Sequence, residues 1–137
     1  MTKEGIFHIQ IQKDPCIALD FAYYIHVLSQ KMNGRPFALF MDNASIHTEK
    51  ELPQDYAKLK ITTVFNVPYS PEFNPIEAVF SKVKRVFSHQ RLHNLVNKIG
   101  FNFDREIEKS FRRISGDHCS ACVRKSFFLL EKACVEV

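Results

Sequence analysis

The sequence has 137 residues, enough for one domain, with 45% hydrophobic and 25% charged residues and a formal net charge of +4. This composition is ordinary for a globular protein and excludes a disordered tail. Since no long apolar segment predicts a secretory signal or a membrane span, we expect an intracellular protein with no membrane partner.

The first predicted elements are a strand and a helix. Phe7, Ile9 and Ile11 alternate with polar residues, which is typical of a strand with one packed face. A helix is predicted from Pro15, and Gly34 is suited to end it. The residues that recur on its apolar face are Phe21, Ile25, Leu28 and Met32.

Two apolar runs predict further strands. Residues 37–41 are wholly apolar, the pattern of a strand covered on both faces, and Asp42 follows at once. Residues 61–67 are rich in β-branched side chains and end at Pro68. Ligands of open α/β sheets bind at the carboxyl ends of strands, so Asp42 stands at a candidate site. Between the runs, residues 48–60 predict short helical turns on a solvated surface.

A longer helix is predicted to open at Asn74. This residue suits the N-cap, and Pro75 suits the first helical position, so Glu77 would lie in the first turn. The apolar residues that repeat at helical spacing are Ile76, Val79, Phe80, Val83, Val86 and Phe87.

Thirty-four residues separate Asp42 from Glu77, room for the helix and strand that would bring both acids to one end of the sheet. Two carboxylates there could hold magnesium. The alternative for Glu77 is a capping box with Asn74. Asn43 is expected to be a turn residue, since its side chain can bond nearby backbone groups. His47 fits a partner of a helix start or of a neighbouring side chain, with a role near phosphate or metal as the other reading.

Taken together, these motifs resemble the Asp-Asp-Glu catalytic domain of mariner-like transposases, most specifically over residues 37–85. In that family a thirty-four residue gap separates the second acid from the third. The resemblance implies a ribonuclease H-like fold, with Asp42 and Glu77 as catalytic, metal-binding acids and magnesium or manganese as the cofactor. It also implies DNA cleavage and strand transfer, in the nucleus if the host is eukaryotic. The residues that carry it are Asp42, Asn43, His47, Pro68, Tyr69, Ser70, Pro71, Asn74, Pro75, Ile76, Glu77, Lys82, Lys84 and Arg85.

The family has another Asp on the first strand of the sheet, far upstream of the second acid. Here 41 residues precede Asp42, and the earlier Asp residues are Asp14 and Asp20. Asp14 precedes a proline and is expected to be a helix N-cap, and Asp20 falls within the following helix. We therefore expect the later part of a catalytic domain, without its first two strands and first catalytic Asp.

Basic residues concentrate after Glu77. Residues 1–77 contain seven Lys or Arg and nine Asp or Glu, while residues 78–137 contain twelve and six. The charge alone is equally compatible with a solvated helix face and with a phosphate-tracking surface. The resemblance favours DNA, which would be contacted without base recognition. The predicted DNA contacts are Lys82, Lys84, Arg85 and Arg91.

Two more helices are predicted near the end of the chain. One is capped near Asn102 and has Phe103, Ile107, Phe111 and Ile114 on one face, and the other begins near Asp117. The second would place Cys119, Cys122, Val123, Phe127, Leu130 and Cys134 on one face. A position on an apolar helix face favours buried thiols. No second cysteine pair stands at zinc-ligand spacing, which argues against a zinc site.

The sequence thus predicts an α/β fold, with a truncated ribonuclease H-like sheet of about three strands, flanking helices and a helical C-terminal extension. Residues 1–92 would form a partial catalytic domain, and residues 93–137 an extension packed on it as one structural unit. The predicted function is that of a transposase-derived DNA-processing domain, catalytically incomplete as this chain. The alternatives are a non-catalytic remnant that binds DNA or pairs with a second copy or a full-length transposase, and a decayed gene product.

Overall fold

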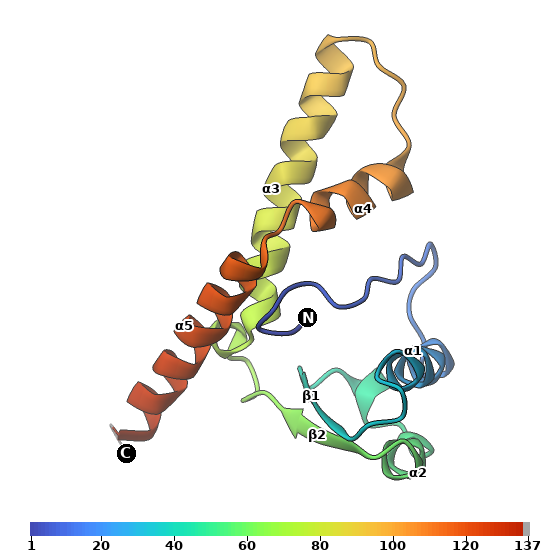
Figure 1. Cartoon of the computed structure of the whole chain (residues 1–137), viewed down its shortest axis with the longest axis vertical. Helices are drawn as coiled ribbons and strands as arrows, with labels where there is room; N and C mark the ends of the chain where they lie inside the picture. The colour runs from blue at the N-terminus through green and yellow to red at the C-terminus, as the bar shows by residue number, and fades with distance from the viewer. Residues whose placement is uncertain (136–137) are drawn as a thin grey trace. The chain divides into compact units, whose positions relative to one another are not determined.

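The computed structural model describes residues 1–135 and is mixed α/β (Figure 1). The chain divides into an α/β unit, Gln10–Pro71, and a helical unit formed by Met1–Ile9 and the residues from Glu72 onward. These two units are the parts of the chain that are compact in themselves. They do not test the boundary predicted at residue 92 between catalytic part and extension, which stays a prediction. The elements are α1 (Ala18–Lys31), β1 (Phe37–Met41), η1 (Ser45–His47), α2 (Leu52–Lys58), β2 (Ile61–Phe65), η2 (Pro71–Phe73), α3 (Pro75–Val96), α4 (Phe103–Arg112) and α5 (Gly116–Val135).

Helix α1 begins later than expected. Its N-cap is Ile17, whose amide donates to the Asp20 carboxylate at 3.0 Å, so the prediction of Asp14 as the cap is wrong. A carboxylate three residues after the N-cap can satisfy an amide that has no helical partner. The predicted end is confirmed, since Gly34 has φ +66° and its amide donates to the Ser29 carbonyl.

The sheet has two strands in the described part of the chain. β1 and β2 pair in parallel, with Phe37 opposite Ile61 and Met41 opposite Phe65. The strand predicted at residues 7–11 is wrong, because that segment has no strand partner and an isolated strand cannot satisfy its backbone groups. Burial alternates along β1, and Phe40 is exposed, so β1 is covered on one face and not on two as expected.

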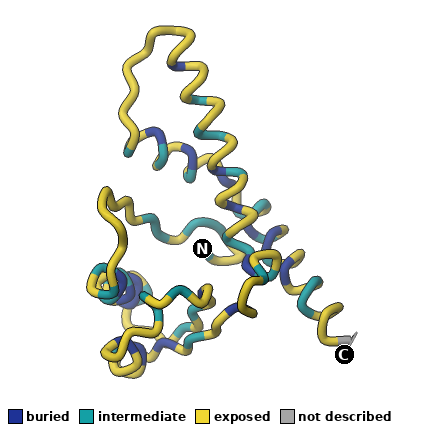
Figure 2. Tube along the Cα trace, turned by 180° about the vertical axis from the view of Figure 1, so that it is seen from behind, coloured by how far each residue is buried: buried dark blue, intermediate teal, exposed yellow. Residues whose placement is uncertain are grey.

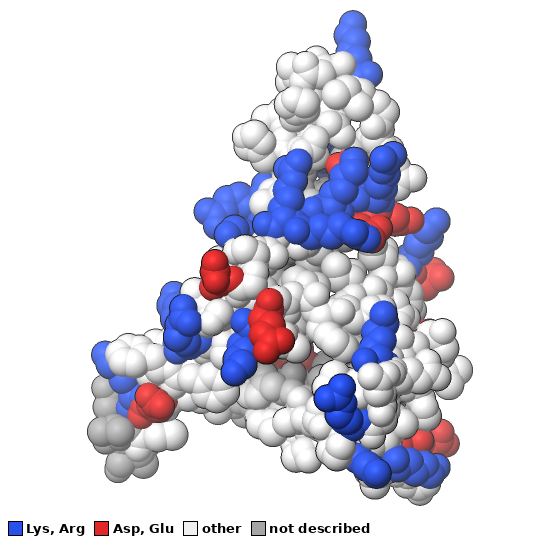
Figure 3. All heavy atoms as spheres, in the orientation of Figure 1, with Lys and Arg blue, Asp and Glu red and all other residues white. Residues whose placement is uncertain are grey.

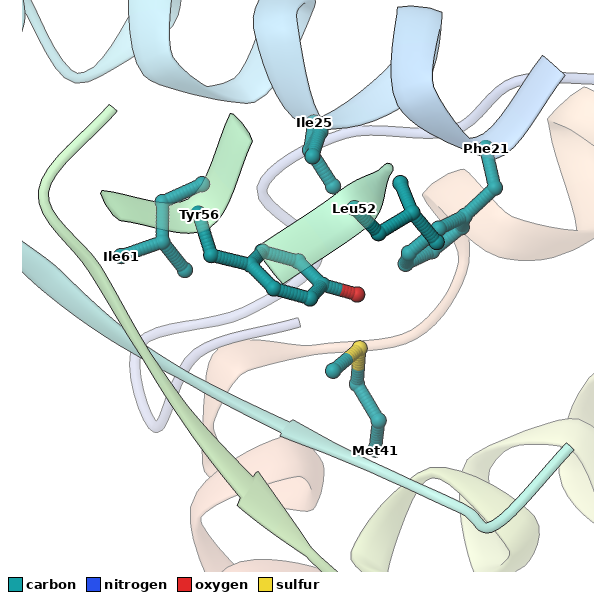
Figure 4. Packing of buried hydrophobic residues seen from close by; sticks show 6 residues of the cluster. All are labelled: Phe21, Ile25, Met41, Leu52, Tyr56 and Ile61. Carbon is teal, nitrogen blue, oxygen red and sulfur yellow. The ribbon is translucent and has the colours of Figure 1, made fainter. Parts of the chain in front are cut away.

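The core of the α/β unit joins α1, α2 and both strands (Figure 4). Leu52 and Tyr56 lie four residues apart and therefore share the inner face of α2. The stretch at residues 48–60 was expected to be a solvated surface. It instead packs on this core, because the large side chains of Leu52 and Tyr56 anchor the short helix α2. The buried cluster contains Phe21, Ile25, Met41, Leu52, Tyr56 and Ile61.

The helical unit is built on α3. The predicted cap is confirmed, since the Asn74 side chain accepts from the Ile76 amide at 3.3 Å and Pro75 opens the helix. In its core, α3 packs against α5 and the end of α4 (Figure 2). No helix among residues 1–135 combines the length and apolar character that crossing a membrane requires. The buried cluster contains Val79, Val83, Ile114, Cys119 and Cys122.

The face predicted to be apolar in α4 is buried only in part: Ile114, just after the helix, belongs to the buried core and Phe111 packs against it. Asn102 caps the helix as expected, but Phe103 is exposed, whereas Glu106 and Ser110 are buried. The Lys109 ammonium lies 2.7 Å from Glu106 and neutralises that buried carboxylate. Aromatic contacts join α3 to α4, with Phe87 packing edge to face on Phe103 and Phe80 packing edge to face on Phe111.

Ile25 is a direct test of the α/β unit. Its side chain is fully buried in the core, so Ile25→Ala should lower the free energy of unfolding by about 2–5 kcal/mol through lost contacts and a cavity. The control is Leu19→Ala on the same helix, where the side chain is 74% exposed and the expected change is within about 0.5 kcal/mol. Urea unfolding measures both, and equal effects would contradict this core.

Candidate functional site

Asp42 lies at the carboxyl end of β1 with its side chain 55% exposed. One carboxylate oxygen, Oδ1, is 3.0 Å from Nδ1 of His47 and accepts from the Ala44 amide at 3.3 Å. The other, Oδ2, has no hydrogen-bond partner among the residues that the structure describes. The geometry therefore orients the carboxylate through one oxygen and leaves the other open to solvent or a cation.

His47 is fixed on three sides. Its ring packs on Phe21 at 4.5 Å between centroids, and its backbone carbonyl accepts from the Tyr56 hydroxyl at 2.9 Å. Burial raises the pKa of Tyr56, which keeps that phenol protonated as a donor. With a proton on Nδ1, His47 donates toward both the side chain and the carbonyl of Asp42. His47 is thus a partner of Asp42, held in place by the core.

Asn66 joins the strand ends to the following turn and was missed in the sequence. Its amide donates to the Met41 carbonyl at 2.7 Å, and its side chain donates to the Ser70 carbonyl at 2.7 Å. The Asn43 side chain in turn donates to the Asn66 carbonyl. The sequence signal that could have identified Asn66 is that it is the one amide residue inside the apolar run at residues 61–67.

Tyr69 stands out in that turn. Its φ is +57°, in the left-handed region, and its side chain is fully exposed. Such a backbone costs a bulky residue about 1–3 kcal/mol and persists where the surroundings impose it. Ser70 supports the turn by donating its hydroxyl to the Pro68 carbonyl, and Pro71 then opens η2.

Glu77 lies in the first turn of α3, as predicted. Its side chain is exposed and makes no hydrogen bond or ion pair with any residue of the described chain, so the capping box with Asn74 is not formed. The carboxylate is therefore open, like Oδ2 of Asp42. Asp42 belongs to the α/β unit and Glu77 to the helical unit, and each unit positions its own acid.

The four predicted DNA contacts occupy two faces of α3. Lys84 and Arg91 are exposed and seven residues apart, which places them on one face. Lys82 and Arg85 lie near His118 at the start of α5. Partial burial, and then the charges of Lys82 and Arg85, lower the pKa of His118.

The described part of the chain contains no group of three or more His, Cys, Asp or Glu side chains that could hold a metal ion. Burial raises the pKa of the Cys119 thiol, and neighbouring Cys122 adds to the rise. Both thiols are buried and free, which suits packing rather than metal binding, whereas the prediction that Cys134 is buried is wrong, since Cys134 is exposed. The exposed carboxylates of Asp42 and Glu77, by contrast, are the oxygen donors that magnesium prefers.

One family model matches the sequence over residues 1–99, and its description is DDE superfamily endonuclease. The matched region contains β1, β2 and α3, with Asp42, Glu77 and the basic residues of α3. No curated protein matches the sequence. Because the family model covers well over half of the 137 residues, this chain belongs to the DDE superfamily endonucleases.

Proposed function

We propose that the chain is a DNA-processing domain of the mariner-like transposase type, in which Asp42 and Glu77 share one divalent ion. The observation that carries the proposal is the Asp42 carboxylate at the end of β1, held by His47 through one oxygen and open at the other. Family membership supports a DNA substrate and a divalent metal, here magnesium or manganese. A nuclear location would follow in a eukaryotic host.

The residues present fit such an ion through oxygen donors. Asp42 Oδ2 and the Glu77 carboxylate would be its protein ligands, and phosphate oxygens and water would complete the coordination. When bound, the ion activates water and stabilises charge on the phosphodiester. His47 orients the Asp42 carboxylate, as outer partners of metal ligands commonly do. Convergence of the two acids on one ion is part of the proposal.

We propose further that residues 1–137 by themselves have little strand-transfer activity. Asp20 lies on α1 and not on a strand, and one of its carboxylate oxygens accepts from the Ile17 amide and from the Gln12 side chain. Both bonds lower its pKa and serve the start of α1. Asp14 lies outside any strand. Two carboxylates form an incomplete clamp for two-metal phosphoryl transfer.

DNA would be held by the basic side of the helical unit. Figure 3 shows Lys and Arg side chains gathered over α3 and α4. On α4, Arg105 is exposed and forms no ion pair among the described residues, unlike Lys109 and Arg112. We propose that Lys84 and Arg91 contact phosphates on this side, with Lys82 and Arg85 as a second pair of contacts.

The division at residue 92 into catalytic part and extension is retained, and the family match ending at residue 99 supports it.

The second candidate is a non-catalytic module that binds DNA or a full-length relative. The observation that favours it is the lack of any three-ligand cluster in residues 1–135. In this case the basic helices would keep their role, and the acids would have none.

Nicking of supercoiled plasmid DNA tests the catalytic proposal. With magnesium or manganese, the 137-residue chain should nick no faster than Asp42→Ala or Glu77→Ala, because two acids do not complete the clamp. Robust nicking that disappears in both variants would contradict catalytic incompleteness. It would still support the assignment of the two acids.

Manganese binding tests the role of His47. His47→Leu should weaken manganese affinity about tenfold, because the Asp42 carboxylate loses its orienting donor. His47→Asn keeps a donor near the Nδ1 position and should recover most of the affinity. Titration calorimetry measures both, with thermal unfolding as a check on folding. Equal affinity in the leucine and asparagine variants, or no saturable binding by the natural chain, would contradict the site.

Salt dependence of DNA affinity tests the basic surface. The double variant Lys84→Ala, Arg91→Ala should reduce the slope of log affinity against log salt by about 2, since each lost phosphate contact removes about 0.9. The matched control, Lys50→Ala with Lys58→Ala, removes the same charge from the α/β unit and should leave the slope unchanged. Equal losses in the two double variants would indicate a general charge effect and contradict this surface.

A further inference from the structure

The second half of α5 has an apolar face that the helical unit does not cover. The first half packs on α3 through buried Cys119 and Cys122, and Ser126 donates to the Glu72 carbonyl at 3.3 Å. Beyond Ser126, α5 runs past the N-terminal end of α3 (Figures 1 and 2). This part of α5 also lies outside the family match, so the family does not account for it.

Four side chains along α5 form what we call the α5 stripe, Val123 just before Ser126 and Phe127, Leu130 and Cys134 beyond it. Phe127 is 58% exposed and Cys134 is exposed, while the other two are half-buried. Their spacing of four, three and four residues repeats every 3.5 residues, which is the period of two helices packed along their length. A stripe of this period is therefore suited to one partner, a second helix.

The charged residues that flank the stripe indicate which helix the partner is. Arg124 and Glu131 are exposed, seven residues apart and on the same edge of the stripe. The other edge has Ser126, which is buried and bonded to the Glu72 carbonyl of its own chain, and Ala133, which is exposed, and neither residue is charged. In a parallel pair of identical helices the charged edge would face this uncharged edge. In an antiparallel pair the charged edges face each other, so that Arg124 of each copy lies opposite Glu131 of the other.

We propose that α5 is a dimerisation helix, which pairs in an antiparallel arrangement with α5 of a second copy of this chain. Phe127 packs beside Leu130 of the other copy, and Val123 beside Cys134. The two Arg124–Glu131 pairs set the direction and register of the helices. This surface is independent of Asp42 and Glu77, and its test does not depend on the proposed DNA chemistry.

Sedimentation equilibrium measures the pairing. The natural chain should show a concentration-dependent dimer, and Phe127→Ser should weaken dimerisation at least tenfold. The matched control is Phe128→Ser, since Phe128 is 55% exposed but lies off the stripe, with the Lys132 ammonium over its ring. Control dimers as weak as those of Phe127→Ser would overturn the proposal. So would a natural chain that is monomeric at all concentrations, with the stripe covered by its own chain or by another protein.

Charge reversal tests the direction of the helices. Arg124→Glu and Glu131→Arg should each weaken the dimer about tenfold, because each places like charges opposite each other twice. The double variant should recover the natural affinity, because the pairs are restored with exchanged signs. A double variant weaker than both single variants would contradict the antiparallel register.

Disulfide trapping gives an independent readout. In a Cys16→Ser background, Val123→Cys places a new thiol opposite Cys134 of the other copy, and oxidation should give a covalent dimer. Within one helix the two positions are roughly 16 Å apart, too far to bond to each other. With Val123 retained, Cys134 should give no covalent dimer. A covalent dimer through Cys134 alone would indicate parallel helices and overturn the proposal.

Discussion

The parallel pairing of β1 with β2 is the constraint on which the candidate site depends. Parallel strands end at the same edge of a sheet, so the residues after Met41 and after Phe65 are neighbours. Asp42 and Asn66 occupy those two positions. Asn66 then bonds to the Met41 carbonyl and to the Ser70 carbonyl, which fixes the turn that follows β2.

Around this edge, a hydrophobic core supports a polar site. Phe21 and Tyr56 belong to the core of the α/β unit, yet they also hold His47, which in turn holds Asp42. The exposed carboxylate is therefore oriented by residues two contacts away from it. Positions of this kind connect stability with chemistry, because damage to the core would also misplace the acid.

Much of this arrangement could be predicted from local patterns. The run before Asp42 has the bounds of β1, and the Asn74-Pro75 pair marks the start of α3, because strand burial and helix capping are local effects. Partners distant in the sequence could not be predicted in the same way. The alternation at residues 7–11 predicted a strand that has no neighbour to bond, and the polar appearance of residues 48–60 concealed Leu52 and Tyr56. The bond from His47 to Asp42 depends on a turn that no pattern specified.

We propose that Asp42 and Glu77, positioned by separate units, bind the same divalent ion. Iron-mediated cleavage measures this directly, since Fe²⁺ in a magnesium site generates radicals that cut the nearby backbone when ascorbate and peroxide are added. A shared ion should give cuts beside both residue 42 and residue 77, and Asp42→Ala should abolish both. Cuts beside residue 77 that persist in Asp42→Ala would show that the two acids do not share an ion.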